Sequence, residues 1–466
     1  MAPTWVLLDR FVKPTIFDEE ESKGKGESTG APVKYLPARL RQEVPAGMRD
    51  VKPYPEVADP PIVSRFSMLI SRKAIRVVES IHVECADKSL VLFYAGTGFP
   101  GFSHGCHLIY DAIDGSLTAV HTFPFPVSGV VWVGTAAVLR HAGGGGGGDG
   151  TTAYVIAELL RPFHGSLPDA TLVMWLSNSP ASTSGSNGQW VKEDVRLPGE
   201  VCTGTDPFTT DLVFSFGESC LCWADLFMGI LFCDLATLRA PRFRFIPLPK
   251  ACSFDPVGKY GRPHMPEFRS MGRVNGVIRL IDMEGFTNEY LAVDEVKLTI
   301  WTLSADLSEW EKGPVCTVGD IWASEEFVAM GLPQLRPMCP VLSMVDEDVV
   351  CVVMTEVEIE ESDVTDFDDE GNKLKFKAQY VLDIDVRRKR VLSITQHHIE
   401  SMGDLIPDLI ACEFTAYLEL SKGMQVLLLR HPTYLVIYSL EVYCSVNTIT
   451  LSTVLMLGYH VQSVTS

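Results

Sequence analysis

The feature that most constrains the fold is a turn signal followed by a short apolar segment, which occurs six times along the chain. The turns lie near residues 87, 150, 218, 276, 347 and 423, and the apolar segments that follow them span residues 89–94, 152–160, 220–223, 277–282, 349–355 and 424–429. Asn275 followed by Gly276 is the strongest hairpin signal, because both residues tolerate the positive φ of a type I′ turn. The pattern predicts an all-β chain in which residues 277–282 form a central strand.

Each repeat continues into a second hairpin, and these hairpins alternate between two kinds. Three run through an aspartate into a return strand, beginning near residues 108, 230 and 380, and three carry an aromatic residue, near residues 173, 299 and 435. Two hairpins per unit and six units predict a six-bladed β-propeller with four-stranded antiparallel blades. The repeats exceed the usual blade of about 40–50 residues, so extra loops are expected. A pair of packed β-sandwiches is the alternative architecture.

The composition of the chain suggests four segments. Residues 1–12 hold the strand-like stretch 5–11, which is predicted to close the ring as the fourth strand of the last unit, near Ser439. Residues 13–62 carry an acidic run and many prolines, which are typical of a linker. Residues 63–445 form the propeller, with helical periodicity at 63–78 and 323–330, and residues 446–466 form an uncharged tail. The tail is the competing candidate for closure, because an open ring leaves an exposed strand edge.

The formal net charge of −20 bears on partners and on location. It repels phosphate backbones, so nucleic acid is not an expected partner. Twelve scattered cysteines give no disulfide framework, and the apolar burst at residues 5–8 is too short for a signal-peptide core. We expect a cytoplasmic and/or nuclear protein. Residues 442–466 lack charges but hold many polar groups, so no membrane association is expected.

Arg279 is the most informative charged residue, because it interrupts an apolar strand. A charge in such a strand must pair or face water. If the strand is the inner one of a blade, Arg279 would face the central channel, with Asp282 or another carboxylate as its partner. Arg279 and Asp282 are therefore the candidate ligand-binding residues, beside a purely structural interpretation of the same pair.

The strongest candidate for a charged interaction site is the run at residues 356–370, which holds nine carboxylates and no basic residue. Its core is Asp366, Asp368, Asp369 and Glu370. The run imitates the start of a calcium loop, but Lys377 stands where the bidentate glutamate is required. Two interpretations stay open, a looser calcium loop of the kind found in propellers and a solvated acidic loop between two strands that contacts a partner.

No other motif predicts a metal or catalytic site. His104, Cys106 and His107 lack a fourth zinc ligand at motif spacing, and Cys220 and Cys222 share one strand face, as core residues do. The repeated positions of Trp175, Trp190, Trp301 and Trp310 predict blade packing. No metal, cofactor or enzymatic activity is expected.

Several longer motifs resemble a known family. They are WVLLDRF at 5–11, DKSLVLFYAG at 87–96, GILFCDLATLRAPRFRFIPLPK at 229–250, GRVNGVIRLIDM at 272–283 and MGLPQLRPMCPVLSMVDEDVV at 330–350. Together they resemble a plant family, expanded in grasses, that carries domain of unknown function 1618 (DUF1618). The units also resemble the propeller repeats that follow F-boxes in plant proteins, although the first 60 residues lack the helical F-box module. The resemblance implies a plant protein but carries no catalytic signature.

These observations lead to two functional hypotheses. The first is a non-catalytic protein-interaction module that uses the loops on one face of the propeller to bind a protein partner. The second is a small-ligand or carbohydrate binder, or an enzyme, with its site in the central channel. Carboxylates and Arg279 converging on the axis would favour the second, and a sealed channel would favour the first.

Overall fold

The computed structural model describes residues 3–17, 44–45, 47–75, 78, 80–96, 105–123, 130–132, 136–140, 154–162, 169–177, 188–202, 208–253, 262–360, 373–397, 406–418, 424–431 and 434–441. Within them the chain is almost entirely β-sheet, with a few short helices. The predicted acidic site and the predicted C-terminal tail lie outside the described residues.

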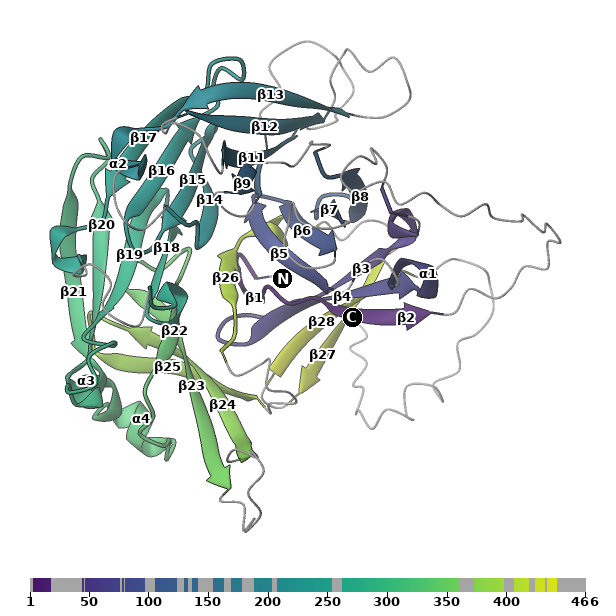
Figure 1. Ribbon diagram of the computed structural model, residues 1–466. Helices are drawn as coiled ribbons and strands as arrows, with labels where there is room; N and C mark the ends of the chain where they lie inside the picture. The colour runs from purple at the N-terminus through teal and green to yellow at the C-terminus, as the bar shows by residue number, and fades with distance from the viewer. Residues whose placement is uncertain are drawn as a thin grey trace, which may run out of the picture.

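Five antiparallel blades of consecutive strands form a propeller. The strands are β5 (Ser80–Asp87), β6 (Leu90–Gly96), β7 (Gly105–Asp111) and β8 (Ser116–His121) in blade 1; β10 (Ala137–Arg140), β11 (Tyr154–Pro162), β12 (Asp169–Ser177) and β13 (Gly188–Arg196) in blade 2; β14 (Leu212–Phe216), β15 (Cys220–Asp225), β16 (Gly229–Asp234) and β17 (Arg242–Pro247) in blade 3; β18 (Arg269–Val274), β19 (Val277–Glu284), β20 (Lys297–Leu303) and β21 (Trp310–Thr317) in blade 4; and β22 (Met338–Leu342), β23 (Val349–Glu360), β24 (Lys373–Asp385) and β25 (Arg390–His397) in blade 5. The short strand β9 (Val130–Trp132) adds to blade 2 by pairing with β11. Figure 1 shows the blades following one another around a common centre. The prediction of an all-β propeller with four-stranded antiparallel blades is confirmed.

The predicted number of six blades is wrong, because the described chain has five. Five of the six apolar segments became the second strand of a blade, namely β6, β11, β15, β19 and β23. The sixth forms β27 (Met424–His431), which pairs with β28 (Tyr434–Glu441) in a two-stranded sheet. A hairpin signal is local and does not specify whether two further strands will flank the hairpin.

The remaining strands form a mixed sheet that brings together segments far apart in the sequence. In it, β1 (Val6–Asp9) pairs antiparallel with β26 (Leu409–Cys412) and parallel with β4 (Val63–Ser71). Figure 1 shows β26 beside β1, near the centre of the molecule. The same N-terminal segment reaches blade 1, since the N–H of Val83 donates to the carbonyl of Arg10. The partners of β1 thus differ from the predicted one, the unit near Ser439, and ring closure by this strand stays a prediction.

Two parts of the predicted linker at residues 13–62 are strands of this mixed sheet. They are β2 (Lys13–Phe17) and β3 (Lys52–Glu56), and both pair with β4. Pro53 and Pro55 alternate along β3, so their missing N–H groups lie on the same edge of the strand. Prolines placed in this way leave the hydrogen bonds on the other edge intact, which explains why a proline-rich segment forms a strand.

The helix predicted at residues 63–78 is wrong over most of its length, because residues 63–71 form strand β4. Phe66, Met68 and Ile70 are all fully buried, and they alternate with less buried residues. This period of two is the pattern of a strand with one face in the core. Only the short helix α1 (Arg72–Ile75) follows it.

The strongest turn signal gives the predicted hairpin. Asn275 and Gly276 have φ values of 48° and 78°, and they join Val274 and Val277, which pair directly. The central strand predicted at residues 277–282 is confirmed, because β19 lies between β18 and β20.

The helix predicted at residues 323–330 is shorter than expected and is preceded by another. The two are α3 (Val318–Trp322) and α4 (Glu325–Ala329). Thr317 and Asp320 form a capping box at the start of α3, and Ser324 caps α4. None of the helices in the described ranges is long and apolar enough to cross a membrane.

Candidate functional site at the channel mouth

The first strands of the blades, with β26, contact one another in a ring around the axis, and we call the space that they enclose the central channel. β14, β18 and β22, together with β26, contribute residues to two hollows along it. Where these strands begin, the hollow has a volume of about 390 Å³. The second hollow lies further along the strands and also touches the end of β5, and its volume is about 80 Å³. The larger hollow therefore lies at the starts of the strands. We call this end the channel mouth, and its lining includes Phe11, His264, Glu267, Pro340, Ile406 and Asp408.

Two of the apolar side chains at the channel mouth are well exposed. Phe11 is 59% exposed and Ile406 is 39% exposed. The backbone turns at this point because the N–H of Phe11 donates to the carboxylate of Asp9, at 3.0 Å. Arg10 is buried instead, and its Nε donates to the carbonyl of Val83 at 2.8 Å. An exposed aromatic side chain beside a hollow is a typical recognition surface.

Two carboxylates add negative charge to the channel mouth. The side chain of Asp408 is 43% exposed and lies 3.3 Å from the guanidinium of Arg10. The side chain of Glu267 is 28% exposed and lies 3.4 Å from Nδ1 of His264, which is itself 63% exposed. Both acidic groups therefore keep part of their surface available to a ligand.

Arg269 also lines the channel mouth, but its guanidinium is fully engaged by the protein. Its Nε lies 2.5 Å from Oδ1 of Asp282. Its two terminal nitrogens donate to the backbone carbonyls of Leu226 and Cys252, at 2.9 and 2.7 Å. Asp282, a predicted ligand-binding residue, is therefore the buried partner of Arg269 and not of Arg279.

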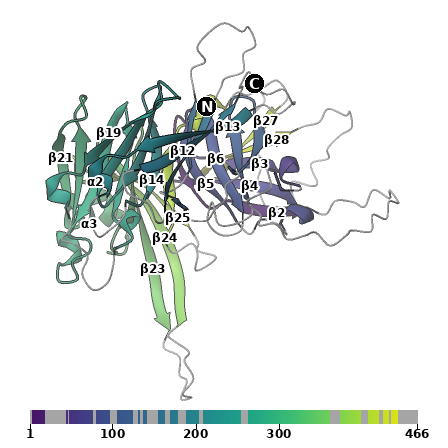
Figure 2. The same ribbon diagram turned by 45° about the horizontal axis from the view of Figure 1, so that its top comes forward.

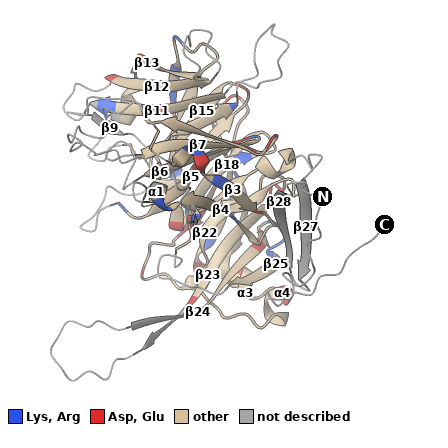
Figure 3. Cartoon of the chain, turned by 90° about the vertical axis from the view of Figure 1, so that its right-hand side faces the viewer, with Lys and Arg blue, Asp and Glu red and all other residues tan. Residues whose placement is uncertain are grey.

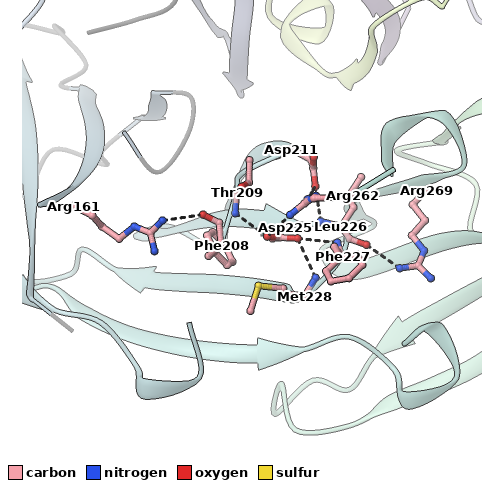
Figure 4. Close-up of polar contacts among 10 residues, drawn as sticks. All are labelled: Arg161, Phe208, Thr209, Asp211, Asp225, Leu226, Phe227, Met228, Arg262 and Arg269. Atoms are coloured by element: carbon pink, nitrogen blue, oxygen red, sulfur yellow. Dashed lines mark hydrogen bonds and ion pairs between the residues drawn. The ribbon is translucent and has the colours of Figure 1, made fainter. Parts of the chain in front are cut away.

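Arg262 bridges two carboxylates beside the channel mouth (Figure 4). It lies 2.7 Å from Asp211 and 2.9 Å from Asp225. Asp225 is fully buried and also accepts hydrogen bonds from the backbone of Thr209 and Phe227. Burial raises the pKa of Asp211 to about 6, and the charge of Arg262 opposes that shift. The bridge links Asp211, which directly precedes β14, to Arg262, which lies before β18.

The other predicted ligand-binding residue, Arg279, does not line either hollow of the channel. It lies on β19, the second strand of blade 4, whereas the first strand is β18. Its guanidinium donates to the carbonyl of Glu347 at 2.9 Å and to the Glu347 carboxylate at 2.6 Å. The structure thus pairs Arg279 with the turn between β22 and β23, and it does not bring Arg279 and Asp282 together.

The predicted acidic site of Asp366, Asp368, Asp369 and Glu370 lies outside the described residues. The strands on either side of it are described, and they are unusually long, at 12 residues in β23 and 13 in β24. They continue beyond the pairing with β22 and β25, and Figure 2 shows this hairpin projecting from the propeller. Lys377 lies 3.5 Å from Glu356 across the hairpin.

The sequence analysis missed a fully buried charge cluster around His107. Nδ1 of His107 lies 3.1 Å from Glu84, and Nε2 lies 2.6 Å from Glu158, which belongs to the next blade. Burial by itself lowers the pKa of His107, but the two carboxylates outweigh it and raise the pKa to about 10. Burial raises the pKa of Glu158, although the imidazolium opposes it. Widely separated residues form this cluster, so no motif spacing indicates it.

The other residues singled out in the sequence are packed against, or paired with, neighbouring parts of the fold where the structure describes them. Cys106 packs in an apolar cluster while His107 binds Glu84 and Glu158, and His104 lies outside the described residues. In the described part of the chain, ten cysteines are free, nine of them buried, and no three His, Cys, Asp or Glu residues are arranged to hold a metal. Trp175 lies directly across from Trp190 with ring centroids 5.7 Å apart, and the indole of Trp310 donates to Pro247 at 2.8 Å.

The comparisons with known proteins give little functional information. Residues 223–351 match a family model described as "Protein of unknown function (DUF1618)", which covers blade 4 and parts of blades 3 and 5. A search of curated proteins finds no match. A structure titled "Crystal structure of the tricorn protease" aligns with 63% of this chain and 26% of its own, at 10% identity and a TM-score of 0.19.

Proposed function

We propose that this chain is a non-catalytic protein-interaction module that binds a protein partner at the channel mouth. The observation that carries the proposal is the exposure of Phe11 and Ile406 beside a hollow of about 390 Å³. Aromatic side chains are enriched at the centres of protein interfaces, where they supply much of the binding energy. The DUF1618 match and the propeller fold are compatible with this role. We expect the protein to act in the cytoplasm and/or the nucleus of a plant cell, without a cofactor.

The lining of the channel mouth supports a rigid docking site. Several of its residues are prolines, whose φ is fixed, and the neighbouring backbone is held by the buried side chains of Arg10 and Arg269. A preformed surface loses little conformational entropy when a partner binds. The same rigidity suits an interaction module that presents one constant surface.

The experiment compares two exposed patches of the same protein. Phe11→Ser combined with Ile406→Ser removes the apolar surface of the channel mouth, and Tyr290→Ser is the control, because Tyr290 is 98% exposed and does not line the mouth. Each tagged protein is used to capture partners from plant extract, and a captured protein is then purified and titrated by calorimetry. We expect the partner to bind the wild type and the Tyr290→Ser control and to bind the double variant at least tenfold more weakly, a loss of about 1.4 kcal/mol. Equal affinity for all three proteins would refute the proposed site.

One observation favours a second candidate, a small-ligand or carbohydrate binder or enzyme with its site in the channel. A volume of about 390 Å³ falls within the range of about 300–1,000 Å³ that is typical of small-molecule pockets. Two partly exposed carboxylates, Glu267 and Asp408, are available to orient a ligand there. A thermal-shift screen of sugars and metabolites tests this candidate, with Glu267→Gln as the variant that should abolish any stabilisation. A stabilising compound whose effect survives in that variant would place its site elsewhere.

A further inference from the structure

The balance of charge at the channel mouth indicates what kind of partner group it can accept. The charged residues on or beside its lining are Asp211, Asp225, Glu267, Asp282 and Asp408, against Arg10, Arg262 and Arg269. Five carboxylates against three guanidiniums leave two negative charges, with His264 not counted. Figure 3 shows acidic and basic positions interspersed along the described chain. The acidic excess at the mouth follows the balance of the whole chain, which has 59 Asp and Glu against 39 Lys and Arg.

The cations at the channel mouth cannot neutralise the excess, because each already has its own carboxylate. Arg269 is bound to Asp282, and Arg262 to Asp211 and Asp225. Arg10 is buried and donates to Val83 as well as to Asp408. Of the five carboxylates, those of Asp408 and Glu267 are the most exposed, with 43% and 28% of their side-chain surface accessible. A cation supplied from outside would therefore find an uncompensated carboxylate at Glu267, with the exposed surface of Asp408, which Arg10 already pairs, as a second contact.

The apolar walls of the channel mouth suit the uncharged part of a lysine or arginine side chain. Phe11, Ile406 and Pro340 line the same hollow as the two carboxylates and offer apolar surface there. Lysine and arginine side chains combine an aliphatic stem with a charged end, and a guanidinium also stacks on aromatic rings. This chain uses that contact internally, with Arg262 5.5 Å from the ring of Phe227 and Arg336 5.2 Å from the ring of Phe286.

We propose that the channel mouth holds an arginine or lysine side chain from a basic, partly apolar segment of a partner protein. The net charge of −20 would speed the approach of such a partner. The inference rests on the proposed interaction function and adds the chemistry of the partner to it.

The test uses two synthetic peptides that differ only in charge. One is a fluorescein-labelled peptide of alternating leucine and arginine, and its twin carries citrulline, a neutral residue of nearly the same shape, in place of each arginine. Both are titrated with the full chain by fluorescence anisotropy at low and moderate salt. We expect the arginine peptide to bind about tenfold or more tightly than its twin, since hydrogen bonds to charged groups are the stronger kind. We also expect added salt to weaken its binding.

Variants show whether the binding occurs at the channel mouth. Asp408→Asn with Glu267→Gln, and Glu267→Gln alone, should weaken binding of the arginine peptide. The control, Glu309→Gln with Glu311→Gln, removes two exposed carboxylates near the turn between β20 and β21 and should leave binding unchanged. Equal affinity for both peptides, no binding of the arginine peptide, or equal weakening by the control variant would overturn the inference. The interaction function itself would still be judged separately, by the Phe11 and Ile406 variants.

Discussion

The regular blades and the mixed sheet pair their strands in two different ways. Blade 4 takes four consecutive strands from one stretch of chain, and each pairs with the next. The mixed sheet takes β1 from the N-terminal region and β26 from residues about 400 positions later. The blade is therefore specified by local turns, whereas the β1–β26 pair of the mixed sheet depends on a contact between segments about 400 residues apart. The difference predicts where damage to the chain should be most costly.

The largest effect is expected from deleting residues 1–12. The deletion removes Val6, Leu7 and Leu8, which are all fully buried, and leaves the edges of β26 and β4 without this partner. Burial of three such side chains contributes about 5 kcal/mol or more, which is comparable to the whole stability of many domains. We expect low solubility and aggregation, measured by light scattering and thermal denaturation. Deleting residues 458–466 is predicted to be nearly silent, and a monomeric N-terminal deletion with an unchanged melting temperature would show that this strand does not close the ring.

The next largest effect is expected between two regular blades, at His107. Replacing His107→Leu would leave Glu84 and Glu158 buried without their shared cation. Breaking a buried pair in this way costs about 3–5 kcal/mol, which chemical denaturation can measure. His264→Leu is the matched control, because that exposed histidine also pairs with a glutamate but should contribute less than about 1 kcal/mol. Similar losses in the two variants would contradict the view that burial makes the difference.

A change of pH probes the same cluster without removing the side chain. The pKa of His107 is raised from 6.5 to about 10, so the folded protein retains a proton that the unfolded chain releases near pH 6.5. The stability from this proton is fully present below about pH 6.5 and is lost as the pH rises towards 10. We expect the difference in unfolding free energy between the wild type and His107→Leu to shrink over this interval. A constant difference from pH 6.5 to 10 would mean that His107 is not protonated in the folded state.

The smallest effect is expected from a purely local change in a regular blade. Gly276 has a φ of 78° in the β18–β19 turn, and no atom lies within 4 Å of the position of an added Cβ. Gly276→Val should therefore act through backbone strain alone and cost about 1 kcal/mol or a little more. Gly199→Val is a suitable control, since its surroundings are equally open and its φ is not in the positive range. Thermal stability that does not change in Gly276→Val would argue against the type I′ turn.

The sequence by itself determined the local parts of this protein. Asn275 and Gly276 set a hairpin because few residue pairs tolerate positive φ at both positions, and the apolar runs after the turns became the second strands of five blades. These features depend on neighbouring residues, so they can be predicted from pattern. The resemblance to the family of unknown function is likewise supported over residues 223–351.

Only the tertiary structure decided which distant residues meet. The sixth hairpin signal was real, yet β26 pairs with β1 and not with that hairpin, so the number of blades could not be obtained by counting turns. The sequence indicated that Arg279 needs a partner, but that partner is Glu347, 68 residues away. The predicted partner, Asp282, pairs with Arg269. The channel mouth combines residues near positions 11, 264, 340 and 406, and no periodicity links them. The physical reason is that turns and strand faces arise from local backbone preferences, whereas ion pairs and hollows depend on how complete strands are arranged around the axis.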